Sequence, residues 1–133
     1  LDNTPTWGRK YWGGAMFWLH VDLEIRRRTE GAKSLDDVLR AVLNTGGSVA
    51  VRWDVARLAL VAETATGTTA LREIYDDWSN KAVAPDLGAL WTSLGVRSEK
   101  PDRVTFDDAA PLAGLRRDLT VKLPAAIIAA SRP

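Results

Sequence analysis

The stretch Tyr11-Trp-Gly-Gly-Ala-Met-Phe-Trp-Leu-His-Val-Asp-Leu-Glu-Ile-Arg-Arg-Arg28 decides the fold, because it predicts the longest helix of the chain. Its first half is apolar on nearly all faces, which is typical of a helix that is buried on most sides. Its second half becomes amphipathic, and its three terminal arginines suit the negative end of a helix dipole. Gly13 and Gly14 each cost about 1 kcal/mol relative to Ala inside a helix, which indicates that a large group lies close to this backbone.

Outward from this stretch, the apolar spacing predicts further helices with recognisable first and last residues. Ser34, Asp54 and Asp86 are expected N-caps, and Gly67 and Gly95 are expected to end helices. Residues 103–106 are expected to form a short extended piece. The sequence therefore predicts an all-α array of about six helices with short loops, folded as a single domain over residues 1–133.

Composition excludes several classes of function. The chain has 133 residues, no Cys and one His, so no disulfide framework, thiolate zinc site or cysteine nucleophile is available. Its 18 basic and 17 acidic residues leave a net charge of +1, which gives no electrostatic case for nucleic acid or for an anionic membrane as a partner. No run of about 18 apolar residues is present, so no membrane span is predicted.

The chain is rich in tryptophan, with six Trp beside two Tyr and two Phe. We expect Trp53, Trp78 and Trp91 to belong to the core, because they lie on or beside amphipathic helices. The other three lie around Tyr11, at positions 7, 12 and 18. A phenol at the entrance of a helix can donate a hydrogen bond to a developing oxyanion. The alternative is that Tyr11 and Trp12 only cover the core.

A metal site within this chain is not predicted. His20 and Glu24 are four residues apart and share a helix face, so they could supply two ligands. A catalytic zinc needs about three protein ligands and an open position, and the sequence indicates no third ligand. The acidic pairs Asp36-Asp37 and Asp107-Asp108 lie at expected helix starts, where carboxylates stabilise the helix dipole.

Three motifs together carry a family resemblance. Tyr11-Trp-Gly-Gly-Ala15, Glu24-Ile-Arg-Arg-Arg28 and Lys33-Ser-Leu-Asp-Asp-Val-Leu-Arg40 resemble the glycyl aminopeptidase family of zinc peptidases. The later stretches 87–96 and 107–116 are similar to the end of those proteins. The resemblance spans about residues 7 to 120, and its first forty residues are the most specific part.

The resemblance implies a helical domain that follows a thermolysin-like catalytic domain with an H-E-x-x-H helix and a downstream Glu ligand. In the related gluzincin aminopeptidases, a Tyr before a Gly-rich helix start stabilises the tetrahedral intermediate, and the matching residue here is Tyr11. Trp12, Gly13 and Gly14 would then line the substrate cleft. The H-E-x-x-H helix, the Glu-bearing helix and a PDZ pattern find no match in this chain.

We therefore expect the chain to be the C-terminal helical part of a larger zinc aminopeptidase and to be inactive alone. Its expected partners are the upstream catalytic domain, which would bind the zinc, and a peptide substrate. A patch around Trp7, Tyr11, Trp12 and Trp18 would be exposed without that domain and would favour self-association. The alternative is a free-standing helical interaction module. The compartment stays open between the bacterial cytoplasm and the periplasm.

Overall fold

The structure is a computed structural model that describes residues 6–80, 85–100 and 102–120. The chain forms two compact units, Leu1–Ala84 and Pro85–Pro133. The described residues are mostly helical, with six α-helices and one two-stranded sheet, which confirms the predicted all-α class with a short extended segment. No helix among them is both long enough and apolar enough to cross a bilayer.

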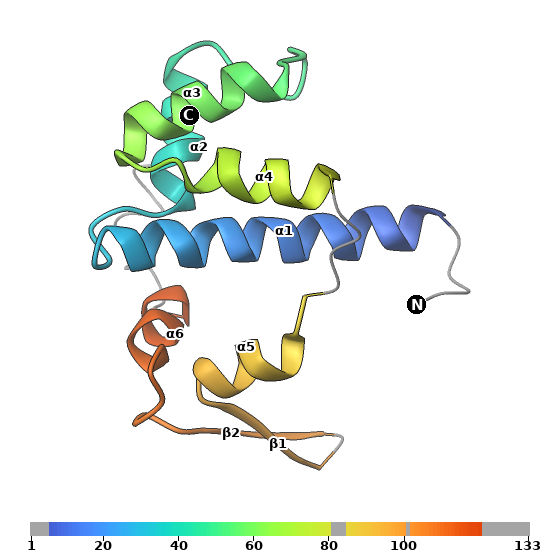
Figure 1. The fold of residues 1–133 in the computed structure, drawn as a ribbon, viewed down its shortest axis with the longest axis vertical. Helices are drawn as coiled ribbons and strands as arrows, with labels where there is room; N and C mark the ends of the chain where they lie inside the picture. The colour runs from blue at the N-terminus through green and yellow to red at the C-terminus, as the bar shows by residue number, and fades with distance from the viewer. Residues whose placement is uncertain (1–5, 81–84, 101, 121–133) are drawn as a thin grey trace, which may run out of the picture. The chain divides into compact units, whose positions relative to one another are not determined.

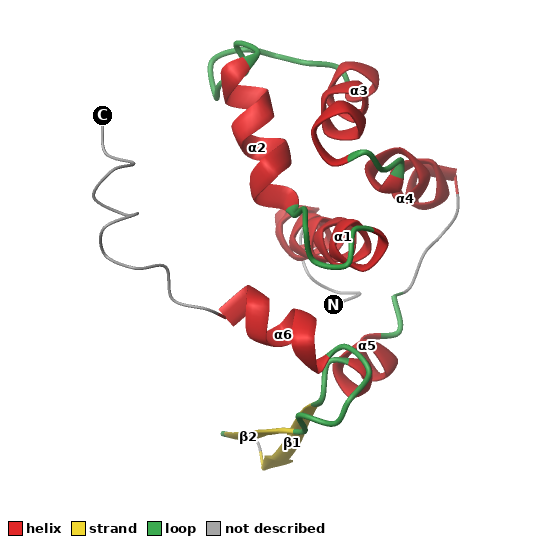
Figure 2. Cartoon of the chain, turned by 90° about the vertical axis from the view of Figure 1, so that its left-hand side faces the viewer, coloured by secondary structure: helices red, strands yellow, loops and turns green. Residues whose placement is uncertain are grey.

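The first unit is built on α1 (Thr6–Arg28), with α2 (Leu35–Asn44), α3 (Val55–Thr66) and α4 (Ala70–Asn80) following in chain order (Figure 1). α1 packs against α2 and α4, and α3 packs against α2 and α4 in turn. Figure 2 looks nearly along α1 and shows α2 and α4 on two of its flanks, with α3 beyond them. The four helices therefore enclose one core.

That core consists of small and medium apolar side chains from all four helices. Val21 and Ile25 of α1 are 0% and 1% exposed, and Val38 of α2 is 1% exposed. The remaining buried members are Ala59, Ala62, Ala70 and Leu71 of α3 and α4. Because three of these four are alanines, α3 and α4 can approach the centre closely and leave little void.

The expected helix boundaries are largely confirmed by their capping bonds. The carboxylates of Asp54 and Asp86 accept from the backbone N–H groups of Arg57 and Ala89, at 2.7 and 2.9 Å. At the start of α2, the Asp37 carboxylate accepts from the backbone N–H of Ser34 at 2.9 Å. Gly67 adopts a left-handed conformation, with φ of 69°, and closes α3.

One expectation about packing is wrong, and one apolar stripe is covered only in part. Leu39 and Leu43 are part of the apolar pattern of α2, but they are 52% and 65% exposed, because α1 and α3 cover only the face that carries Val38 and Val42. Trp91 is 38% exposed and so is not a core residue. Helical spacing identifies a stripe of apolar residues but does not decide how much of the stripe a neighbouring helix covers.

Asp22 is the polar link between α1 and α2. Its carboxylate accepts from the backbone N–H of Leu35 at 2.7 Å and from the Arg26 guanidinium at 2.9 Å, and the residue is only 6% exposed. The first bond satisfies one of the N–H groups that a helix start leaves without a partner. A single carboxylate therefore sets where α2 begins relative to α1.

The second unit contains α5 (Leu87–Ser93), β1 (Val96–Lys100), β2 (Arg103–Phe106) and α6 (Ala113–Thr120). β1 and β2 form an antiparallel hairpin in which Val96 lies opposite Phe106 and Ser98 opposite Val104, with an irregularity between Ser98 and Lys100. β2 coincides with the extended piece that the sequence predicts. β1 was not predicted, because Val-Arg-Ser-Glu-Lys carries one apolar residue and no alternation.

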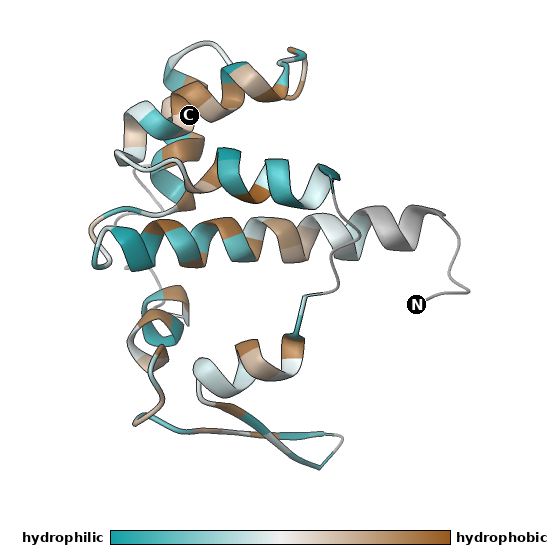
Figure 3. Cartoon of the chain, viewed as in Figure 1, coloured by the Kyte–Doolittle hydropathy of each residue, from teal (hydrophilic) through white to brown (hydrophobic). Residues whose placement is uncertain are grey.

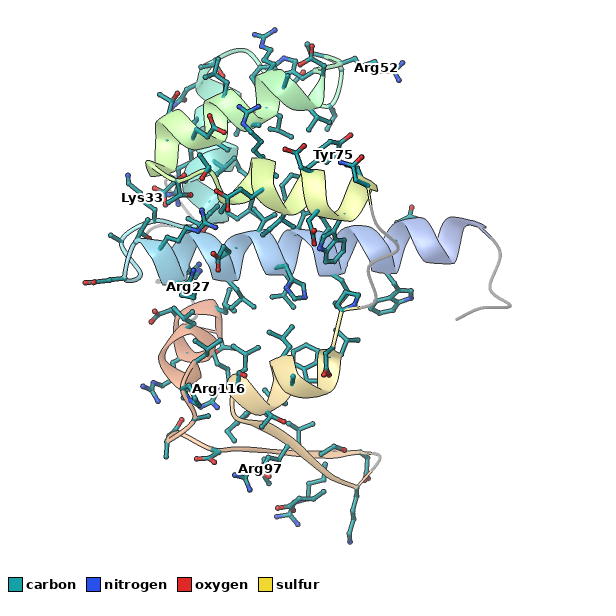
Figure 4. All side chains as sticks on the ribbon, viewed as in Figure 1. Arg27, Lys33, Arg52, Tyr75, Arg97 and Arg116 are labelled. Atoms are coloured by element: carbon teal, nitrogen blue, oxygen red, sulfur yellow. The ribbon has the colours of Figure 1, made fainter. Side chains whose placement is uncertain are left out.

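Arg116 of α6 holds this unit together, and Figure 4 labels it. Its Nη1 donates to the carbonyl oxygens of Leu94, Gly95 and Asp107 at 2.8 to 3.2 Å, and its Nη2 donates to the Asp108 carboxylate. The guanidinium also lies 4.8 Å from the centre of the Phe106 ring. Arg116 is 8% exposed, so one buried cation satisfies the backbone where α5, the hairpin and α6 meet.

Gly95 is the close-packed point of the same unit. Its φ is 71°, and a Cβ there would collide with the Asp107 carbonyl oxygen and lie 2.8 Å from both Ala110 Cβ and Arg116 Nη1. Only glycine combines this backbone conformation with this approach. The turn from α5 into β1 therefore depends on a residue without a side chain.

We predict that Asp22→Ala lowers the free energy of unfolding by about 2 kcal/mol or more, because it leaves the Leu35 N–H and a nearly buried Arg26 without their acceptor. Urea unfolding measures this. Asp36→Ala is the matched control, since Asp36 is exposed and its nearest basic atom is 4.0 Å away. An equal loss in both variants would contradict the role of Asp22.

We predict that Arg116→Met destabilises the second unit by about 3 kcal/mol, because buried carbonyl groups lose their donor. Hydrogen exchange should then speed up over residues 87–119 and stay unchanged over 17–78. Arg117→Met removes the neighbouring but exposed guanidinium and should have little effect. Slow exchange over 87–119 in Arg116→Met would refute the prediction.

Candidate functional site

The candidate site lies on the first half of α1. Tyr11 is 71% exposed and Trp12 is 63% exposed, so the two aromatic side chains point mainly into solvent. The helix begins at Thr6 and not at Tyr11 as predicted. The phenol of Tyr11 is therefore carried by a helix that has begun five residues earlier. Arg9 and Lys10, which precede Tyr11, have high helix propensity. A side chain on a helix is held more precisely than one on a loop.

Gly13 and Gly14 leave a bare strip of backbone directly after these aromatics. A Cβ added to either glycine would meet no described atom within 4 Å. The large group that the sequence predicts next to this backbone is thus not supplied by the described residues. The strip instead gives an approaching molecule direct access to the helix backbone beside Tyr11 and Trp12.

An aromatic cluster anchors α1 just beyond this strip. The rings of Phe17 and Trp18 are 5.1 Å apart and nearly perpendicular, and Phe17 meets Trp78 of α4 at 5.6 Å in the same edge-to-face manner. Phe17 and Trp18 also pack against the core. Trp18 is predicted to lie in the exposed patch, but it packs against the core and does not belong to that patch. The side chain of Trp7 lies outside the described residues.

The second half of α1 is the part that the core holds. Figure 3 shows apolar residues recurring along this part of the helix, and Figure 1 shows its N-terminal end continuing past the end of α4. The helix is thus rigidly fixed at one end and uncovered by α4 at the other. This arrangement presents Tyr11 and Trp12, which are 71% and 63% exposed, on a helix that is fixed behind them.

The described residues do not form a zinc site. His20 packs against Trp78 at 5.5 Å between ring centres, its Nε2 is buried without a hydrogen-bond partner, and burial lowers its pKa. The Glu24 carboxylate, the other conceivable ligand, accepts from Arg27 and Arg28 at 2.7 to 2.8 Å. No group of three or more potential ligands lies together among the residues that the structure describes. Glu24 is therefore paired with arginines, while His20 keeps a buried Nε2 that has no hydrogen-bond partner among the described residues.

Glu24 instead belongs to an ion-pair network at the end of α1. Arg28 donates to Glu24 at 2.7 Å and to Glu73 of α4 at 2.5 Å, which joins the two helices. Thr69 also donates to Glu73 at 2.5 Å. The donors from Arg27 and Arg28 hold the pKa of Glu24 at about 2, and Arg28 does the same for Glu73. The three arginines of the sequence motif therefore serve structure here.

The second unit has a separate surface hollow of about 600 Å³. It is lined by Trp91 and Thr92 of α5 and by hairpin residues that include Arg97, Ser98 and Val104. Arg97 is already paired with Asp107 at 2.6 Å. Among its described lining residues the hollow thus offers an indole and hydroxyl groups, and the guanidinium of Arg97 is paired.

Comparison with protein-family models, curated proteins and solved structures gives no match for this chain. The family resemblance therefore rests on the sequence motifs alone.

The ion pairs of Glu24 and Glu73 predict an acid-sensitive first unit. Both carboxyl groups have a pKa of about 2 when folded, against 4.5 ordinarily, so the unfolded chain binds their protons first. Their contribution to stability is complete above about pH 5 and is lost as the pH falls towards 2. Urea unfolding between pH 5 and 2.5 should show a smaller loss for Glu24→Gln than for the original chain.

Glu30→Gln is the control for this measurement, because Glu30 is exposed and its substitution breaks no ion pair among the described residues. It should keep the pH dependence of the original chain. The prediction fails when Glu24→Gln and the original chain lose stability in parallel.

Proposed function

We propose that this chain is the C-terminal helical part of a zinc-dependent aminopeptidase that resembles the glycyl aminopeptidases, and that Tyr11 is a catalytic residue of the intact enzyme. The observation that carries the proposal is the 71% exposure of Tyr11 on a helix whose other half is fixed in a core. An exposed aromatic pair costs solubility and adds nothing to the core. The exposure of this pair is explained if Tyr11 and Trp12 contact another domain and a substrate in the intact enzyme.

In this proposal the Tyr11 hydroxyl donates a hydrogen bond to the oxyanion that develops on the scissile carbonyl of a peptide. A donor that is already oriented stabilises the charge without reorganising during the reaction. The orientation would come from α1, which the aromatic contacts of Phe17 and Trp18 anchor directly behind the site.

Trp12, Gly13 and Gly14 would form one wall of the substrate cleft. The absence of side chains at the two glycines lets an extended peptide or a helix of the catalytic domain approach the backbone of α1. The stability lost by placing two glycines inside a helix is then compensated by this close approach. Zinc and its ligands are assigned to the upstream part of the protein, since Glu24 is paired with two arginines and no group of three potential ligands lies together among the described residues.

The first test is substitution of Tyr11 by Phe in the protein that includes the upstream segment. We predict that kcat for an aminoacyl peptide substrate falls about 10²–10³-fold while KM changes little, because the lost bond forms mainly in the transition state. Tyr75→Phe is the matched control, since Tyr75 is the other tyrosine of the chain, is 38% exposed and lies on α4 (Figure 4). Turnover of Tyr11→Phe equal to that of Tyr75→Phe would refute the catalytic role.

Reading the coding sequence upstream of Leu1 separates the peptidase from a free-standing interaction module. An H-E-x-x-H helix followed by a Glu-bearing helix supports the peptidase. A start codon next to Leu1 excludes it and leaves the exposed Tyr11 and Trp12 as a docking surface.

A further inference from the structure

The hairpin of the second unit has two edges, and the hydrogen-bond pattern shows which backbone groups face outward. The Asp107 N–H donates to the Gly95 carbonyl at 2.8 Å, so these residues occupy a hydrogen-bonding position of the ladder, while the Gly95 N–H donates to the Thr92 carbonyl at 3.0 Å. Such positions alternate along an antiparallel ladder, and Arg97 with Thr105 is the next. The N–H and C=O groups of Val104 and Phe106 therefore point away from β1, while those of Val96 and Ser98 point away from β2.

The two edges differ in how they are protected against pairing with another strand. β1 has an irregularity between Ser98 and Lys100 and ends in a lysine, and both features discourage edge pairing. β2 is regular and carries two large apolar side chains, Val104 and Phe106, which are 53% and 63% exposed. An exposed apolar strand with unpaired backbone groups is a template for another strand. The exposed edge of β2 is therefore the one on which another strand can pair.

We propose that β2 pairs with β2 of a second copy of this chain, antiparallel and about a two-fold axis at Thr105, which gives a four-stranded sheet. The outward groups of Val104 bond to those of Phe106 in the other copy, and the reverse pair forms by symmetry. Thr105 lies opposite its own copy as a non-hydrogen-bonded pair. The interaction is independent of the function proposed for Tyr11.

The charges and apolar residues of β2 select this register. With the axis at Thr105, Val104 lies opposite Phe106, and Arg103 lies opposite Asp107 on both sides. Moving the axis by one residue to Val104 places Phe106 opposite Asp102. Moving it to Phe106 places Val104 opposite Asp108. An apolar side chain opposite a carboxylate stabilises a sheet less than two apolar side chains or two opposite charges. Of the three axes, only the one at Thr105 therefore places apolar opposite apolar and basic opposite acidic residues.

The charged groups near this interface are compatible with it. Asp107 already pairs with Arg97 at 2.6 Å, and Arg103 of the other copy would add a second cation to a carboxylate whose pKa is lowered by its hydrogen bonds to Ala109 and Arg97. Asp108, which would lie opposite Asp102 beyond the strand ends, is held by Arg116 and Arg117. The like charges outside the ladder are thus partly compensated.

A single cysteine tests the register directly, because the chain has none of its own. In a non-hydrogen-bonded antiparallel pair the Cα atoms are about 4.5 Å apart, which suits a disulfide. We predict that Thr105→Cys forms a covalent dimer under mild oxidation at least about tenfold faster than Ser98→Cys, which places the thiol on the other edge. Equal rates for the two variants would overturn the proposal.

Proline substitutions test the edge without a new covalent bond. The N–H groups of Val104 and Ser98 both point out of the hairpin, so Val104→Pro and Ser98→Pro should each leave it folded, as the exchange of the Asp107 amide would report. Sedimentation equilibrium of the 133-residue chain should show a monomer–dimer equilibrium. We expect Val104→Pro to weaken dimerisation about tenfold or more and Ser98→Pro to leave it unchanged. A purely monomeric original chain, or equal weakening by both variants, would overturn the proposal.

Discussion

The contact of the Asp22 carboxylate with the first N–H group of α2 is the interaction on which the first unit depends. It fixes the start of α2 against α1, and the Arg26 guanidinium balances the buried charge. Val21 and Ile25, on either side in the sequence, are then positioned to meet Val38, Ala59 and Leu71 in the core. Because all of this lies in the second half of α1, the first half is left to present Tyr11 and Trp12.

The second unit uses the same physical solution with the opposite charge. Arg116 is a buried cation whose donors satisfy three carbonyl oxygens, and Gly95 removes the side chain that would keep those carbonyls apart. A short helix, a hairpin and another short helix have too little apolar area for a large core. A well-satisfied polar centre therefore has the greater structural role here, and the strand edge and its apolar side chains stay exposed.

The predictable features are those that depend on neighbours in the chain. Caps such as Asp54 and Asp86, and the turn glycine Gly67, act within one helical turn, and the structure confirms each of them. The features that could not be predicted depend on distant contacts. Leu39 is exposed because none of the described helices covers its side of α2, and β1 forms because Arg116 and Gly95 bring it against β2. The exposure of Tyr11 has the same origin, since it depends on which distant segments pack against the first half of α1.

The sequence by itself determined the helical class and most of the helix ends, since residue type, spacing and local hydrogen bonding decide these. Tyr11, Trp12, Gly13 and Gly14 are candidate residues that the family resemblance implies. Only the tertiary structure decided that His20 is packed against Trp78, that Glu24 is engaged by arginines, and that β2 keeps an open apolar edge. The physical reason is that burial and charge pairing are properties of the space around a side chain, and that space is filled by residues far away in the sequence.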